Sequence, residues 1–146
     1  MAFGVREVTA GDAEAVAGLL GELGYPSTAA EVSQRLESWM DEPYSRVLLA
    51  IDHDDRVVGS MSVHALPHLE RNGRWLRIES LVVTAGAQGT GAGRRLIGAA
   101  EELARSWGCH AVEVTSSRRR EGAHAFYRRL GFTDICGRAG RFWKDL

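Results

Sequence analysis

The stretch of sequence that decides the fold reads LVVTAGAQGTGAGRRLI and runs from Leu81 to Ile97. An apolar run leads into a glycine-rich turn, and the turn leads into a helical pattern. The first backbone N–H groups of a helix have no partner inside it and carry the positive end of its dipole. Glycines at 89, 91 and 93 leave no side chain over those groups, so a phosphate can approach closely. The order therefore predicts an anion site, with Arg94 and Arg95 as added positive charge.

Two other phosphate-binding motifs do not fit this spacing. A P-loop has a glycine, four residues and then Gly-Lys-Ser/Thr, and Ala92 stands where the lysine would be. A dinucleotide-binding turn reads G-x-G-x-x-G, and Arg94 stands where its third glycine would be. Glu113 lies at a distance suited to an acid that binds a ribose, but nothing else in the sequence supports that interpretation.

Capping signals and apolar stripes predict four helices. Asp12 can cap the first helix, and Gly24 ends it. The second begins at the capping box formed by Thr28 and Glu31. The third follows the glycine turn and has a regular apolar stripe up to residue 107, and the fourth covers residues 122–130.

Apolar and alternating runs predict strands at 3–8, 46–52, 57–66, 75–83 and 110–116, and a final hairpin of 132–136 and 141–144. The order β-α-α-β-β-β-α-β-α-β-β contains three consecutive strands, which repeated βαβ units cannot give. We therefore expect one domain over residues 1–146 with an α/β (α+β) fold. Its central sheet is mixed and largely antiparallel, with helices on both faces.

Composition limits the class of protein. The chain has 146 residues and a net charge of −1, so no bulk attraction to nucleic acid or to an anionic membrane is implied. Cys109 and Cys136 are too few for a disulfide framework or a zinc site, and no metal is expected. No apolar run approaches the ~20 residues that span a bilayer, and the N-terminus has no signal-peptide pattern. We expect a cytoplasmic protein; its oligomeric state stays open, a homodimer included.

Two motifs resemble the GNAT superfamily of N-acetyltransferases. The pyrophosphate loop of that family reads Gln/Arg-x-x-Gly-x-Gly/Ala, which residues 88–93 match. The late helix of the family ends in Tyr-x-x-x-Gly-Phe, which Tyr127, Gly131 and Phe132 match. The predicted order of elements is similar to that of the family as well. The resemblance implies acetyl-CoA as co-substrate.

The resemblance also implies where acetyl-CoA is held. The pantetheine arm would pair like an extra strand with the backbone of Leu81, Val82 and Val83. The pyrophosphate would take the backbone N–H groups of Gln88, Gly89, Thr90, Gly91, Ala92, Gly93 and Arg94. Many relatives carry an asparagine seven residues before the tyrosine, and here that position is Arg120, within the arginine run 118–120. Arg120 either reaches phosphates of CoA or an acidic acceptor, or belongs to a solvated basic loop.

Acetylation of an amine by a thioester requires a neutral amine and a stabilised thiolate leaving group. The resemblance implies direct attack in a ternary complex, without an acyl-enzyme. Glu79 is the candidate general base, acting through water, because alternation over 75–83 places it on the less apolar face. The alternative is that Glu79 only pairs with Arg77 or with a cross-strand arginine. The resemblance implies that Tyr127 is the general acid beside the CoA sulfur, and the alternative is an ordinary core tyrosine.

The acceptor is the least determined part. In the family the first pair of helices walls the acceptor pocket, so the resemblance implies that Tyr25 and Pro26, which lie between these helices, line that pocket. His64 lies on the polar face of its strand and either reaches into that pocket, serves as a second base, or is a surface residue. We expect a small-molecule amine as the acceptor. A protein N-terminal or lysine acetyltransferase and a non-catalytic acyl-CoA sensor remain open, as do acyl groups other than acetyl.

Overall fold

A computed structural model describes residues 3–116, 120–138 and 141–146. The chain forms two compact units, Met1–Thr115 and Ser116–Leu146, and each is described by itself. One domain over residues 1–146 stays a prediction. No helix in the described part of the chain is long and apolar enough to cross a membrane.

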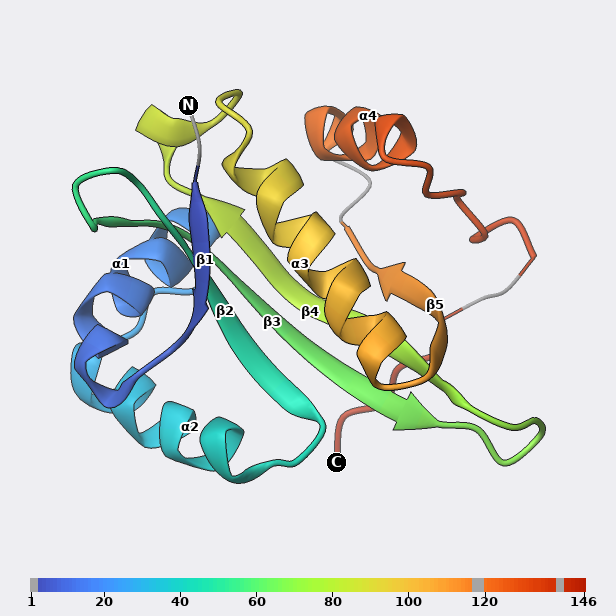
Figure 1. The fold of residues 1–146 in the computed structure, drawn as a ribbon. Coiled ribbons are helices and arrows are strands. Elements are labelled where there is room, and N and C mark those ends of the chain that lie inside the picture. Colours follow the sequence, from blue (N-terminus) through green and yellow to red (C-terminus); the bar gives the residue numbers. More distant parts are fainter. Residues whose placement is uncertain (1–2, 117–119, 139–140) are drawn as a thin grey trace. The chain divides into compact units, whose positions relative to one another are not determined.

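The first unit is built on a five-stranded sheet whose strands lie side by side in chain order (Figure 1). The strands are β1 (Gly4–Glu7), β2 (Ser45–Ile51), β3 (Val57–Pro67), β4 (Arg74–Val83) and β5 (Cys109–Val114). The first four pair antiparallel, and β5 joins β4 in parallel. The mixed, largely antiparallel sheet expected from the sequence is therefore present.

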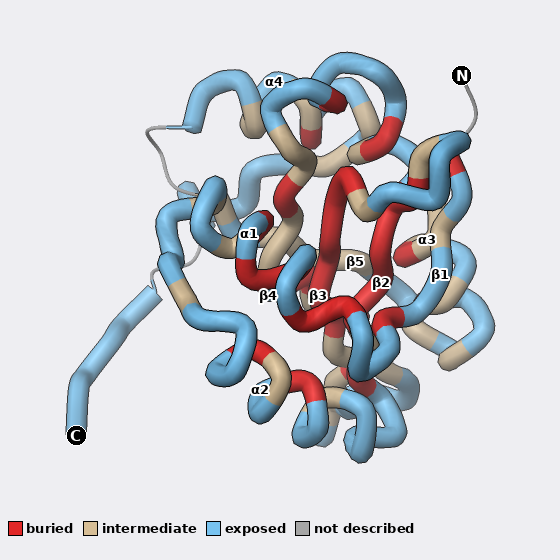
Figure 2. Tube along the Cα trace, turned by 90° about the vertical axis from the view of Figure 1, so that its left-hand side faces the viewer, coloured by how far each residue is buried: buried red, intermediate tan, exposed pale blue. Residues whose placement is uncertain are grey.

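Helices cover both faces of this sheet (Figure 1). On one face, α1 (Ala13–Leu23) and α2 (Ala29–Asp41) form an apolar core with alternate residues of β2. On the other, α3 (Ala92–Ser106) packs so closely that a Cβ at Gly59 would lie 3.3 Å from the Leu96 side chain and 3.0 Å from the Val82 carbonyl oxygen. Figure 2 shows the buried residues concentrated on β2 and β3, between the two helical layers.

The structure confirms two of the predicted helix caps but not the capping role of Asp12. The capping box of α2 is confirmed: the Glu31 N–H donates to the Thr28 hydroxyl at 3.1 Å, and the Thr28 N–H donates to the Glu31 carboxylate at 3.0 Å. Gly24 ends α1 with φ at 108°, also as predicted. Asp12 lies at the N-cap position of α1, but its side chain makes no capping bond to that helix. The carboxylate instead binds Arg6 and Thr9, because both lie within its reach.

The predicted alternation over 75–83 is wrong, because β4 contains a bulge. Ser80 pairs with Ser62 and Ile78 pairs with Val63, so Glu79 is an extra residue without a cross-strand partner. Paired residues share a face of the sheet. Ile78 therefore shares the α3 face with Val63, while Ser80 lies on the opposite face with Ser62. Because Glu79 is inserted, the residues of β4 that follow it lie on the faces opposite to those that unbroken alternation predicts.

The second unit contains α4 (Glu121–Arg129), within one or two residues of the prediction, and Gly131 follows with φ at 91°. The predicted final hairpin is wrong: residues 132–138 and 141–146 contain no strand. Local bonds take up backbone groups that a hairpin would need. The Cys136 N–H donates to the Asp134 carboxylate at 3.0 Å, and the Arg138 N–H donates to the Ile135 carbonyl at 2.9 Å.

The buried Asp12 generates a prediction about stability. Its two carboxylate oxygens accept bonds from Arg6 at 2.8 and 2.9 Å, and Oδ2 also accepts from the Thr9 N–H at 2.7 Å. The Arg6 hydrogen bond, aided by Thr9, holds the pKa of the Asp12 carboxyl well below its usual value, although burial opposes the shift. A lowered folded-state pKa stabilises the fold above the unfolded value of about 3.9 and loses that effect as pH falls through the folded value.

We therefore expect Asp12→Asn to lower the free energy of unfolding by about 1–3 kcal/mol at pH 7. The difference from wild type should shrink as pH falls from 5 to 2, because wild type loses the ionised carboxylate over that range. Urea unfolding across this pH series measures it. Asp41→Asn is the control, since Asp41 is exposed at the end of α2. A difference that does not change with pH would contradict the assignment to the Arg6–Asp12 pair.

Candidate functional site

The glycine turn leaves a run of amide groups without partners. A short 3-10 turn, Ala85–Ala87, leads into the turn, where Gly89 and Gly91 have φ of 75° and 103°. In the described chain, no acceptor bonds the amides of residues 89–94. The next amide along the chain is that of Arg95, and it donates to the Gly91 carbonyl at 3.0 Å. The start of α3 therefore offers six N–H groups to an anion.

Side chains hold the turn in shape without using those amides. The side-chain amide of Gln88 donates to the Val83 carbonyl at 3.0 Å, and the Thr90 hydroxyl donates to the Ala87 carbonyl. Glu22 of α1 accepts from the Thr84 hydroxyl at 2.9 Å and from the Ala85 N–H at 3.1 Å. The sequence did not lead us to predict this contact of Glu22 with the turn. Its signal was an acid in the last turn of a helix, where the helix dipole disfavours negative charge.

The edge of β4 beside the turn is open. Parallel pairing with β5 ends at Ile78 and Val114. From Glu79 to Val83, no strand among the described residues lies along that edge, while β3 continues along the other. Leu81 and Val83 are half-buried and Val82 is buried. A chain of amides can pair with such an edge as an added strand.

Charged side chains gather at the bulge. The Arg77 Nε lies 3.4 Å from Glu79 Oε2, and Arg77 Nη1 lies 3.5 Å from Glu113 Oε1. Arg77 and Glu113 are direct neighbours in the register of β4 and β5. Half of the Glu79 side chain is exposed. The ion pair with Arg77 that the sequence left open is present, and a catalytic role for Glu79 stays a prediction.

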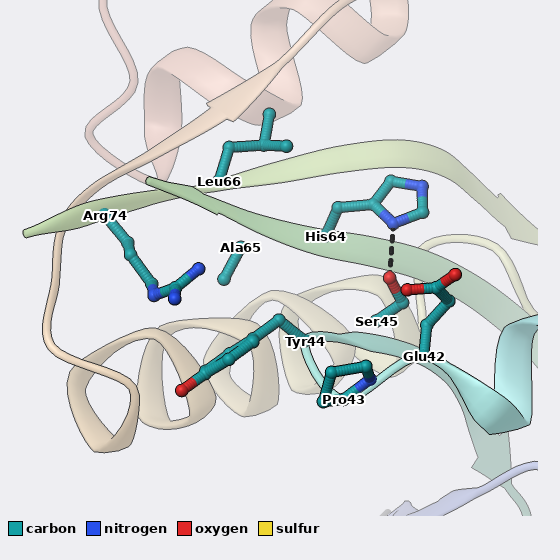
Figure 3. Close-up of a pocket in the computed structure, with 8 residues that line it drawn as sticks. All are labelled: Glu42, Pro43, Tyr44, Ser45, His64, Ala65, Leu66 and Arg74. Carbon is teal, nitrogen blue, oxygen red and sulfur yellow. Dashed lines mark hydrogen bonds between the residues drawn. The ribbon is translucent and has the colours of Figure 1, made fainter. Parts of the chain in front are cut away.

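His64 is held from two sides. Its Nδ1 lies 2.6 Å from the Ser45 hydroxyl, and its ring stacks on Trp39 of α2 with centroids 4.2 Å apart. It lines a cavity of about 370 Å³ (Figure 3). The lining residues are Glu42, Pro43, Tyr44, Ser45, His64, Ala65, Leu66 and Arg74. Tyr25 and Pro26 are exposed and do not line this cavity.

In the second unit, Tyr127 is buried and contacts the rings of Phe126 and Phe132, at centroid distances of 5.4 and 5.7 Å. Burial raises the pKa of the Tyr127 phenol, and the charge of Arg120 offsets part of that shift. The phenol is therefore protonated at neutral pH and can donate a hydrogen bond. Arg120 is exposed immediately before α4, and the neighbouring arginines 118 and 119 lie outside the described residues. In the described chain, no group of three or more His, Cys, Asp or Glu could hold a metal ion.

The model of the Acetyltransferase (GNAT) family matches residues 16–132. The chain belongs to the GNAT acetyltransferase family. A GNAT acetyltransferase from Staphylococcus aureus has the same fold, with a TM-score of 0.82 at 23% identity over 100% of both chains.

Two curated relatives of this GNAT chain match it in part. Glucosamine 6-phosphate N-acetyltransferase of Trypanosoma brucei brucei is 41% identical over 53% of this chain and 51% of its own length. Aminoalkylphosphonate N-acetyltransferase of Salmonella typhimurium is 38% identical over 52% and 49%. The chain thus spans about half the length of the curated relatives it matches.

The open amides lead to a prediction about CoA. A Cβ at Gly91 would meet open space, where the phosphates must approach. We expect Gly91→Val to weaken CoA binding about 10-fold or more, since one lost hydrogen bond to a charged group is worth ~1.5–3 kcal/mol. Calorimetric titration with CoA measures it.

The same substitution strains the backbone, because φ at Gly91 is positive, and such strain costs ~1–3 kcal/mol. Gly108→Val is the matched control: Gly108, just after α3, has φ at 71° and equally open space. Both variants should lose similar thermal stability, and only Gly91→Val should lose affinity. Equal affinities in the two variants would remove the turn from the site.

Proposed function

We propose that this chain is an acetyl-CoA-dependent N-acetyltransferase that acetylates the primary amine of a small molecule by direct attack in a ternary complex. One observation carries the proposal. The six amides of residues 89–94, which bond no acceptor among the described residues, closely follow a strand edge that is open for pairing. CoA fits this arrangement, because its anionic pyrophosphate is joined to pantetheine, which is a chain that contains amides.

The donor contributes an acetyl group as a thioester, and residues of the chain hold it and move protons. The amides of residues 89–94 bind the pyrophosphate, and the exposed Arg94 adds charge. The backbone of Leu81, Val82 and Val83 pairs with the pantetheine amides. These slim apolar side chains leave room for the arm.

Glu79 accepts the amine proton in this proposal. An alkylamine has a pKa near ~10, so at neutral pH it arrives as an ammonium without a lone pair. A half-exposed carboxylate reaches such a proton through water. The amine nitrogen then forms the new bond to the acetyl carbon as the carbon–sulfur bond breaks. His64 is the alternative base, and its Nε2 bonds no described residue.

Tyr127 donates a hydrogen bond to the departing sulfur in this proposal. Support comes from its place in the Tyr-x-x-x-Gly-Phe motif and from the raised pKa of its phenol, which keeps the proton on oxygen. A thiol has an ordinary pKa near ~8.5, so the thiolate needs stabilisation more than full protonation.

The acceptor is proposed to be a small amine with a phosphate or phosphonate group. The names of the two curated relatives support this class: one acts on glucosamine 6-phosphate and the other on an aminoalkylphosphonate. Both acceptors combine an amine with a phosphorus oxyacid group.

Free CoA released from acetyl-CoA with a panel of amines tests the function. We expect release with small phosphorylated or phosphonylated amines.

Glu79→Gln should lower the rate ~10²–10⁴-fold near neutral pH. The rate of the variant should recover as pH approaches the pKa of the amine, where the substrate deprotonates unaided. Release with peptide amines alone would indicate a protein acetyltransferase. Binding of acetyl-CoA without release would indicate a sensor, and a pH profile parallel to wild type would assign Glu79 to structure.

For Tyr127, the hydroxyl interaction grows as charge builds on sulfur, so it should affect turnover more than affinity. Tyr127→Phe keeps the ring that packs on Phe126 and Phe132. We expect turnover to fall roughly 10–1000-fold, with acetyl-CoA affinity within a few-fold of wild type. Steady-state kinetics beside a direct titration decide it. Wild-type turnover in this variant would make Tyr127 a packing residue.

A further inference from the structure

A row of polar side chains crosses the sheet on the face that α1 and α2 cover. Ser45 of β2 pairs with His64 of β3, His64 pairs with Arg77 of β4, and Arg77 pairs with Glu113 of β5. Paired residues on neighbouring strands share a face, so these four side chains lie next to one another. We call them the polar row. Glu79 adjoins it through Arg77.

The positive half of the polar row has free hydrogen-bond donors. Arg77 contacts its two carboxylates at 3.4 and 3.5 Å, longer than the ~2.7–2.9 Å of tight charge-assisted bonds. A guanidinium carries five N–H donors, and these loose contacts leave several of them for a ligand. His64 uses Nδ1 toward Ser45. When the Ser45 hydroxyl donates to Nδ1, Nε2 carries the proton and can donate as well.

The negative half lies within the same few ångströms. Glu79 and Glu113 flank Arg77, so two carboxylates meet one guanidinium. The three groups together carry one net negative charge, which favours an ammonium. A ligand that carries only a cation leaves the Arg77 donors unused, and a ligand that carries only an anion meets two carboxylates. A zwitterion satisfies both halves.

We propose that Arg77 and His64 bind the phosphate or phosphonate group of the acceptor, while Glu79 and Glu113 bind its ammonium group. This assignment rests on the proposed function. The planar fork of a guanidinium matches the oxygens of such a dianion. Because Arg77 Nε lies 3.4 Å from Glu79 Oε2, the two charges of the acceptor are only a few bonds apart. The acceptor class is therefore a short aliphatic amine with the phosphorus group two or three carbons away.

Arg74 is a second arginine on the same strand, and it does not fit this role. It stacks over the Tyr44 ring at 3.8 Å and lines the cavity at the end away from His64 (Figure 3). Arg74 and Glu79 are five positions apart, and five steps at ~3.4 Å per strand residue span about 17 Å. A short acceptor cannot span that distance. Arg74 therefore provides the matched control for Arg77.

The test compares kcat/KM for 2-aminoethylphosphonate with that for n-propylamine, which lacks the anion. We expect wild type to prefer the phosphonate. Arg77→Gln should reduce that preference roughly 10–100-fold, the range for a lost hydrogen bond to a charged group. Arg77→Lys should restore part of it, since the charge returns without the fork. Arg74→Gln should keep the wild-type ratio. A role in stability alone would not change a ratio of two substrates.

Other probes test the separation of charges and the source of the anion. O-phosphoethanolamine should behave like 2-aminoethylphosphonate if the site recognises a dianion, and a preference for either compound over n-propylamine supports the assignment. Glucosamine 6-phosphate should be poorer, because its amine and phosphate lie across a sugar ring. If it is the best of the three, the short separation of charges is wrong.

Failure of this assignment is distinguishable from failure of the proposed function. If no amine releases CoA, the proposed function fails, and calorimetric titration of 2-aminoethylphosphonate in the presence of CoA still tests the site. Binding that Arg77→Gln abolishes and Arg74→Gln retains supports the assignment. If amines are acetylated without preference for the anion, or if only Arg74→Gln removes the preference, the assignment is overturned while the function stands.

Discussion

The bulge at Glu79 determines which side chains of β4 reach each face of the sheet. Before it, Ile78 lies on the α3 face opposite Val63, and after it Ser80 lies on the other face, where its hydroxyl is 2.6 Å from that of Ser62. An unbroken alternation would keep Ile78 and Ser80 on one face. The bulge thus lets Ile78 pack under α3 before Glu79 and places the Ser80 hydroxyl beside that of Ser62 after it. It also falls where β5 stops pairing with β4.

Side-chain bonds hold the backbone of the glycine turn in place. Its own polar side chains satisfy carbonyl groups, as Gln88 does at Val83 and Thr90 does at Ala87. Glu22 fastens the preceding residues to α1. The amides that remain belong to a backbone that these bonds hold on one side and α3 holds on the other. Donors fixed in this way need no reorganisation when an anion binds, which is the physical advantage of preorganisation.

The sequence predicted features whose partners are local. Thr28 and Glu31 are three residues apart, and the turn of residues 88–93 precedes its own helix, so both could be read directly. The bulge could not, because it is defined by how β4 pairs with β3. The prediction of a final hairpin was wrong because the Asp134 side chain accepts a bond from the Cys136 backbone N–H, which a hairpin would need. The contacts of Glu22 with Thr84 and of Arg77 with Glu113 join residues 62 and 36 positions apart, which no spacing rule reveals.

The polar row connects binding of the acceptor with removal of its proton. Arg77, proposed to bind the phosphorus group, lies 3.4 Å from Glu79, proposed to take the amine proton. Under the proposed binding mode, the phosphorus group of the acceptor takes over donors of Arg77 and competes with Glu79 for its charge. The Glu79 carboxylate is then free to contact the ammonium that lies beside it. An acceptor without the anionic group leaves the ion pair of Arg77 with Glu79 intact. The same group that gives affinity would therefore also hold the ammonium beside the carboxylate that takes its proton, so selectivity should appear in kcat as well as in KM.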